Sequence, residues 1–270
     1  PGFLQEAAMT KAASEYPDVK FIFIDGYPLS DASGNTLANV VGVAFHEEQC
    51  GYLAGYAAVK EGNTKLGFTG GGGGTNPAVN RYGYGFVQGA QAAAAEDGVN
   101  VEMNYSYLYG DGYSASAELQ TQINGWYSNG TEIVFACGGS MCNSVFAAAA
   151  ANNALSIGVD VDQSAESSTV MTSAMKGLDA TVNMILTAIK DGKWSDYVGK
   201  IDNLGMVSDD PGENYVQLPR ATTQWADGLY TDADYLQLVK DIHGGKITIS
   251  NDITAMPSVS ITVNDYGRIK

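Results

Sequence analysis

The chain has 270 residues, of which 45% are hydrophobic and 16% are charged, a composition typical of a globular protein with a buried core and not of a disordered chain. Its 14 basic and 30 acidic residues give a formal net charge of -16, and the basic residues form no cluster, so binding to nucleic acid is not expected. No stretch reaches the roughly 18 apolar residues that a membrane-spanning helix needs.

Short apolar runs alternate with segments of helical periodicity along most of the chain. The runs at 19–25 (VKFIFID) and 40–45 (VVGVAF) are typical of strands buried on both faces. Further strands are predicted at 65–71, 99–108, 132–139 and 155–162, and helices at 47–62, 78–98, 116–130, 144–153, 179–194 and 232–243. The β-branched alternation at 253–269 suits edge strands.

Such alternation predicts an α/β fold with a parallel, doubly wound sheet. Ligands of these sheets bind beyond the carboxyl ends of the strands, so chemically active side chains are expected at one rim. The residues at the predicted strand ends are Asp25, Gly26, Gly70, Gly71, Tyr109, Gly110, Asp111, Gly138, Gly139, Asp160 and Asp162.

The glycine run at 70–74 suggests a phosphate-binding loop, but its context does not fit one. A P-loop places lysine directly after its last glycine, whereas Thr75 follows here and the nearest lysine, Lys65, precedes the run. A dinucleotide fingerprint also needs an acid at the end of the next strand, which here ends near Tyr109. We therefore expect a strand-to-helix turn whose bare backbone approaches a neutral ligand or the facing part of the protein.

Two acids and a lysine lie at the ends of consecutive apolar runs. If the strand continues through Val161, Asp160 and Asp162 point to one side and can accept hydrogen bonds from a diol; alternatively, one caps the next segment and the other is solvated. Lys176 ends the run at 169–176 and either contacts a ligand or is solvated. The aromatic residues near the rim, which can stack on a flat ligand or simply pack, are Tyr27, Tyr82, Tyr109 and Tyr113.

The sequence contains no recognisable catalytic or metal-binding motif. Cys50, Cys137 and Cys142 give an odd count and fit no zinc spacing, so they are expected to be small buried residues. Neither His46 nor His243 lies beside a candidate nucleophile. We expect a binding protein without enzymatic activity, cofactor or metal.

Several blocks between about Tyr16 and Asp191 occur in the order known from one protein family. They are EYPDVKFIFIDG, NVVGVAFHEEQCGYLAGYAA, KLGFTGG with NPAVNRYGYGFVQGA, IVFACGG, and IGVDVDQ with TSAMK. Together they resemble the basic membrane protein (BMP) family, substrate-binding lipoproteins of ABC transporters similar to the PnrA-type purine nucleoside receptors.

The resemblance implies a type I periplasmic-binding fold, in which two α/β lobes joined by a three-stranded hinge close over a ligand. The N-terminal lobe would comprise residues 1–42 and about 177–192, and the C-terminal lobe 43–176 and about 193–270. Family members begin with a strand and helix that this sequence lacks, so the first lobe is expected to be N-terminally truncated.

The resemblance also implies roles for individual residues. Asp25 would face the purine ring, Asp160 would hold the ribose hydroxyls, and Lys176 would reach the same ligand. Gly138 and Gly139 would offer their backbone to it. Tyr109 stands where the family usually has Phe in a Ser-Phe-x-Asp block, of which Asp111 is the acid.

By this resemblance the protein is an extracytoplasmic, periplasmic or cell-surface receptor, held at the membrane only by a lipid anchor outside this chain. Its expected partners are a small neutral ligand, most simply a purine nucleoside, and the permease of an ABC importer; a monomer is expected. Two alternatives stay open: the ligand-sensing domain of a transcription regulator with the same fold, and an enzyme that cleaves nucleosides.

Overall fold

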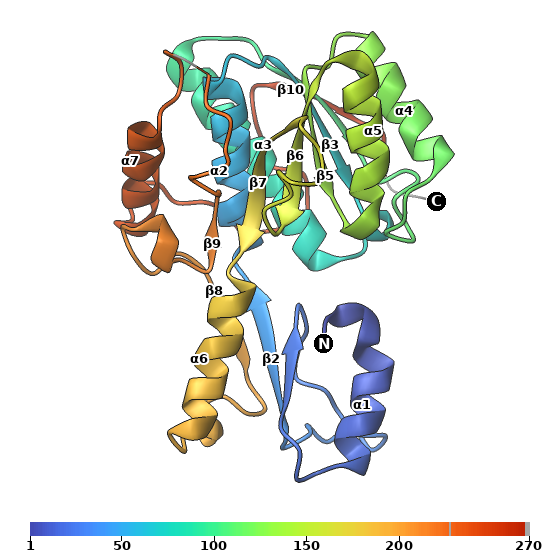
Figure 1. Cartoon of the computed structure of the whole chain (residues 1–270), viewed down its shortest axis with the longest axis vertical. Coiled ribbons are helices and arrows are strands. Elements are labelled where there is room, and N and C mark those ends of the chain that lie inside the picture. Colours follow the sequence, from blue (N-terminus) through green and yellow to red (C-terminus); the bar gives the residue numbers. More distant parts are fainter. Residues whose placement is uncertain (227, 268–270) are drawn as a thin grey trace. The chain divides into compact units, whose positions relative to one another are not determined.

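The computed structural model describes residues 1–226 and 228–267 (Figure 1). The chain divides into two compact units, Pro1–His46 with Gly177–Gly205 and Glu47–Lys176 with Met206–Lys270. Each unit is therefore built from segments that are distant in the sequence. Both contain helices and parallel strands, which confirms the predicted α/β class.

The first unit contains a three-stranded parallel sheet. Its strands are β1 (Phe21–Ile24), β2 (Val40–Phe45) and β8 (Ile201–Leu204), in the order β1-β2-β8. Helices α1 (Glu6–Glu15) and α6 (Leu178–Lys190) belong to the same unit. Because β8 pairs with the whole second half of β2, this unit runs to His46 and to Gly205, later in each case than the expected bounds of 42 and 192.

The second unit contains a seven-stranded sheet in the order β10-β4-β3-β5-β6-β7-β9. Its parallel strands are β3 (Lys65–Gly70), β4 (Glu102–Ser106), β5 (Ile133–Cys137), β6 (Leu155–Asp160), β7 (Val170–Lys176) and β10 (Thr262–Asp265). Only β9 (Val216–Gln217), at one edge, is antiparallel among the described strands. The other edge is β10, the one strand formed by the described part of the segment 253–269, where edge strands were predicted; residues 268 and 269 lie outside the described residues.

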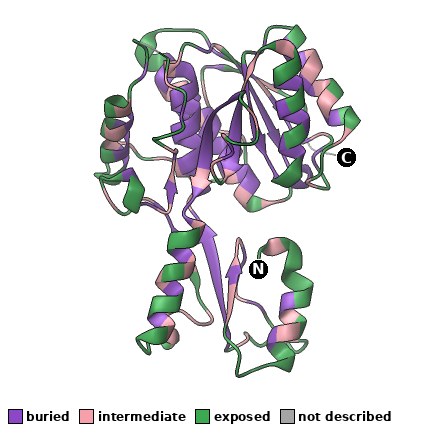
Figure 2. Ribbon diagram, in the orientation of Figure 1, coloured by how far each residue is buried: buried purple, intermediate pink, exposed green. Residues whose placement is uncertain are grey.

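Helices pack on both faces of this sheet, as Figure 2 shows by the buried strands between them. The helices are α2 (Glu47–Lys60), α3 (Pro77–Asp97), α4 (Ala117–Ser128), α5 (Cys142–Asn152) and α7 (Asp232–His243). Along β5, Phe135 packs against Tyr82 and Phe86 of α3, whereas Val134 and Ala136 join the apolar cluster of α4 and α5. Side chains of a strand alternate between faces, so one buried strand supplies both cores.

Helices α2 and α3 lie very close together because glycines of each helix face the backbone of the other. A Cβ atom on Gly51 or Gly55 of α2 would lie 2.1 Å from a carbonyl oxygen of α3, and one on Gly85 or Gly89 of α3 would lie 2.1 Å from a carbonyl oxygen of α2. Side chains at these positions would push the helices apart. The close contact fixes the starts of both helices, where several charged side chains lie.

Within the described ranges, no helix combines the length and the apolar character needed to cross a lipid bilayer.

Candidate functional site

The predicted ligand residues of the second unit lie at or after the carboxyl ends of its strands; the strands are labelled in Figure 1. Asp160 and Lys176 are the last residues of β6 and β7, and Gly138 and Gly139 follow β5 directly. Tyr109 and Asp111 lie in the turns after β4. Asp25 follows β1 and belongs to the first unit.

Asp160 and Lys176 form an ion pair at this edge. The Nζ atom of Lys176 lies 3.3 Å from Oδ1 of Asp160 and 5.3 Å from the ring centroid of Tyr82. The hydroxyl of Tyr82 donates to the same Oδ1 atom at 3.2 Å. The Lys176 side chain is 3% exposed and that of Asp160 is 40% exposed, so the solvated-lysine alternative is wrong and the acid remains accessible.

A second carboxylate, on Glu47, lies behind this pair. Its Oε1 atom is 3.4 Å from Nζ of Lys176, and its Oε2 atom accepts a hydrogen bond of 2.6 Å from Nε of Arg81. The Glu47 side chain is 1% exposed. As the first residue of α2, Glu47 also lies at a helix N-terminus, whose dipole favours an anion.

Sequence reasoning did not identify Glu47 and Arg81 as part of the site. The available signal was an acid at the start of a helix whose residues 50–59 are apolar, aromatic or small, since a charged group beside such a buried segment must find a partner. The partner could not be named, because Glu47, Arg81 and Lys176 come from three separate elements.

Strand β6 does not continue through Val161, so the condition under which Asp160 and Asp162 would point to one side is not met. The strand ends at Asp160, whose φ of 65° turns the chain. Asp162 instead accepts hydrogen bonds from the Ser164 amide and, at 2.7 Å, from the Thr222 hydroxyl. Burial opposes the ionisation of Asp162, but these hydrogen bonds outweigh it and lower the pKa of its carboxyl. Asp162 thus caps the following segment, as the alternative held, whereas Asp160 is paired with Lys176 and Tyr82 and not merely solvated.

The glycine-rich turns at the ends of β3, β4 and β5 pack against one another. The Gly71 amide donates to the Cys137 carbonyl at 2.8 Å, and the Gly72 amide donates to the Gly110 carbonyl at 3.0 Å. A Cβ atom on Gly71 would lie 2.4 Å from the ring of Tyr113. The bare backbone of the glycine run therefore accommodates Tyr113 and a neighbouring turn of its own unit.

The other predicted residues are spread along the edge. Gly138 has a φ of 156°, and a Cβ atom there would lie 2.9 Å from Cα of Gly71. Tyr109 is half-exposed and borders a hollow of about 500 Å³ beside the start of α4. Asp111 is exposed in the next turn. The structure thus joins Asp160 to Lys176, and Gly138 to the glycine-rich turns.

The cysteines are buried and have free thiols, as expected. Burial raises the pKa of Cys137 well above its usual value, and the nearby Asp160 carboxylate raises it further. Burial likewise raises the pKa of Cys50, so both thiols stay protonated at neutral pH. Among the described residues, no group of three or more histidines, cysteines or acids could hold a metal ion.

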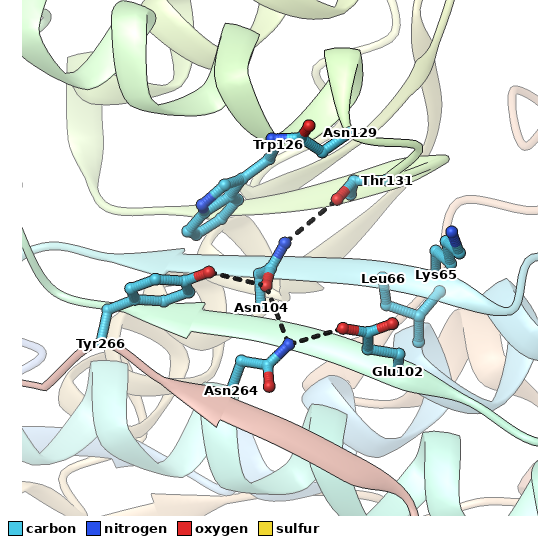
Figure 3. Close-up of a pocket in the computed structure, with 9 residues that line it drawn as sticks. All are labelled: Lys65, Leu66, Glu102, Asn104, Trp126, Asn129, Thr131, Asn264 and Tyr266. Carbon is cyan, nitrogen blue, oxygen red and sulfur yellow. Dashed lines mark hydrogen bonds between the residues drawn. The ribbon is translucent and has the colours of Figure 1, made fainter.

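A separate polar pocket of about 160 Å³ lies near the amino ends of β3 and β4 (Figure 3). Its polar side chains bond to one another: Asn104 donates to Thr131, and Asn264 donates to Glu102 at 2.7 Å. Tyr266 completes the set through its hydroxyl, which donates to Asn104. None of the predicted ligand residues lines this pocket.

Comparison with known proteins shows which family the chain resembles. A family model described as ABC transporter substrate-binding protein PnrA-like matches residues 1–209. The ABC transporter nucleoside-binding protein BmpA of Lactococcus lactis is 28% identical over 267 residues, which is 92% of this chain and 69% of that protein. Basic membrane protein D of Borreliella burgdorferi is 31% identical over 219 residues, which is 76% of this chain and 60% of that protein.

A solved structure gives the same result for the fold. A solute-binding protein of an ABC transporter from Aeropyrum pernix superposes with a TM-score of 0.67 at 22% identity, over 93% of this chain and 76% of that one. This likeness shows the type I periplasmic-binding fold. Because the family model matches most of the chain, the chain belongs to the family of PnrA-like ABC transporter substrate-binding proteins.

Proposed function

We propose that this chain is the ligand-binding part of an extracytoplasmic receptor that captures a purine nucleoside for an ABC importer. The observation that carries this proposal is the state of Asp160. Its Oδ1 atom is held by Lys176 and Tyr82, while the carboxylate remains 40% exposed at the edge of the sheet. A fixed, accessible carboxylate can accept hydrogen bonds from two neighbouring hydroxyls, as on a ribose.

The remaining predicted residues have roles in the same proposal. Lys176 orients Asp160 and donates to the ligand, and Asp25 of the first unit binds the polar edge of the base. The peptide groups of Gly138 and Gly139 contact the ligand through the backbone. Tyr109 stacks on the flat base, and Asp111, the acid of the same block, also contacts the ligand.

The choice of a nucleoside rests on relatives as well as on the site. BmpA of Lactococcus lactis, a relative over most of this chain, is a nucleoside-binding protein by its name. A carboxylate that recognises the ribose and an aromatic ring that stacks on the base together distinguish a nucleoside from either of its halves. The two compact units would then be the lobes of the type I fold.

The proposal includes the setting in which the receptor works. Its partner is the permease of the importer, its place is outside the cytoplasm, and a lipid anchor outside this chain holds a monomeric protein at the membrane. The site binds and releases its ligand without chemical change.

Two matched aspartate variants test the proposal. Asp160→Asn keeps the shape of the side chain but removes the charged acceptor, and we expect the affinity for inosine, adenosine or guanosine to fall by about 2 kcal/mol, roughly thirtyfold in Kd. Asp162→Asn, two residues away, is expected to leave Kd within a factor of two because its carboxylate is engaged by Ser164 and Thr222. Isothermal titration of the complete gene product gives both values. Equal losses in the two variants, or none in Asp160→Asn, would remove the ribose clamp from the proposal.

A further inference from the structure

The edge that carries Asp160 has two cations close behind it, and one buried acid lies between them. Lys176 and Arg81 are each within reach of Glu47, whose two carboxylate oxygens are divided between them. Oε1 lies 3.4 Å from the lysine and Oε2 lies 2.6 Å from the arginine. Glu47 therefore bridges the two positive groups.

Because these charged groups are buried, their net charge acts on a ligand at this edge with little screening by solvent. The Glu47 and Lys176 side chains are 1% and 3% exposed, and that of Arg81 is 16% exposed. Water and salt screen such groups much less than charges on the surface. Removing the acid would therefore raise the local positive charge by one unit, and little solvent is present to compensate for it.

We infer that Glu47 is a specificity-determining residue that favours uncharged nucleosides over their phosphorylated forms at this site. The inference rests on the proposed function. Lys176 and Arg81 are the residue types that bind phosphate in other proteins, and Glu47 occupies both of them. A nucleoside monophosphate brings two negative charges to an edge whose nearest cations are already neutralised, whereas a nucleoside brings none.

Glu47 also positions Lys176. The ammonium group lies between the Glu47 and Asp160 carboxylates, at 3.4 and 3.3 Å, and above the ring of Tyr82. Its attraction to both carboxylates restrains the ammonium group, which in turn restrains the Asp160 carboxylate. A neutral residue at position 47 would free Lys176 to follow an anionic ligand.

The test compares two variants that change the charge of the site in opposite directions. Glu47→Gln keeps the size of the side chain and removes the negative charge, and Arg81→Gln removes a positive charge. The measured quantity is the ratio of Kd for a nucleoside 5′-monophosphate to Kd for the same nucleoside, by isothermal titration at neutral pH. We expect Glu47→Gln to lower this ratio roughly tenfold, the effect of one poorly screened charge at several ångströms, and Arg81→Gln to raise it.

Glu15→Gln is the matched control. Glu15 lies exposed at the end of α1 in the first unit, and its loss changes the net charge of the protein by the same amount. We expect it to leave the ratio unchanged. If Glu47→Gln does not fold, as judged by circular dichroism, the test rests on Arg81→Gln alone. Arg81 is more exposed than Glu47, so its replacement is expected to disturb folding less.

The outcomes separate this inference from the proposed function. If the unmodified protein binds nucleosides but the ratio stays within a factor of two in Glu47→Gln and Arg81→Gln, the inference is wrong and the function stands. If the control shifts the ratio as much as Glu47→Gln, the effect belongs to the net charge and the inference is again wrong. If the unmodified protein binds no nucleoside, both fail.

Discussion

Three residues of the proposed site hold a left-handed backbone conformation. The φ angles are 58° at Asp25, 63° at Tyr109 and 65° at Asp160. Such angles are unfavourable for residues with a Cβ atom, and they cluster at functional sites where the surrounding structure enforces them. Each of the three follows or ends a strand, so the turn redirects its side chain where the sheet ends.

Replacing Tyr109 separates stability from binding at the residue scale. Tyr109→Asn places at φ 63° a residue that tolerates this conformation better, and the lost side chain is half-exposed. We therefore expect the free energy of unfolding to rise by about 0.5–1 kcal/mol, while nucleoside affinity falls with the loss of stacking. Urea unfolding and isothermal titration measure the two quantities. Lower stability in this variant would show that the backbone strain is not real.

At this scale the sequence predicted the positions of the candidate residues in the sheet better than the contacts that hold their side chains. Asp160 was expected at this edge because strand ends of a parallel sheet meet there, whereas only the family resemblance assigned Lys176 to the same ligand. The contact with Glu47 was not predicted, because it depends on how close α2 comes to β7. Asp160 and Asp162 have different partners because the strand ends in a left-handed residue at Asp160, which the local sequence does not specify.

Among the elements, the pair of α2 and α3 decides the geometry of the site. Glu47 begins α2, and Arg81 and Tyr82 lie in the second turn of α3. The glycines between the two helices let these starts approach until their charged side chains meet. From the sequence alone these glycines count only as poor helix formers. Their role in bringing the two helices together can be recognised only in the folded structure.

A pair of glycine variants tests the role of this helix contact. Gly51→Ala in α2 would place Cβ 2.1 Å from the Tyr82 carbonyl oxygen, so we expect a loss of about 1–3 kcal/mol in unfolding free energy from overpacking. Gly125→Ala in α4 meets no atom within 4 Å and is expected to gain about 0.5–1 kcal/mol in helix propensity. Chemical denaturation compares them. A gain in both variants would contradict the close approach of the helices.

The order of elements was predictable because alternation of apolar runs and helical periodicity is a local property. The strand predicted at 40–45 and the helix predicted at 232–243 match β2 and α7 residue for residue. Strand order in the sheet is not local: β10, near the end of the chain, pairs with β4. The pairing of β8 with β2, which extends the first unit, was missed for the same reason.

For the whole molecule, the family is established by a match over residues 1–209, and the chain spans 69% of BmpA of Lactococcus lactis and 60% of basic membrane protein D. The net charge of -16 gives such a receptor no general attraction for anions. The proposed function accordingly has a neutral ligand held by local groups, Asp160 and Lys176 among them.

The most direct test of the central claim is isothermal titration of the complete gene product with inosine, adenosine and guanosine, and with the matching free bases and ribose. We predict micromolar or tighter binding of at least one purine nucleoside, much weaker binding of the separated halves, and recovery of the ligand unchanged by chromatography. Equal affinity for a free base and its nucleoside, or no binding of any purine nucleoside, would contradict the account.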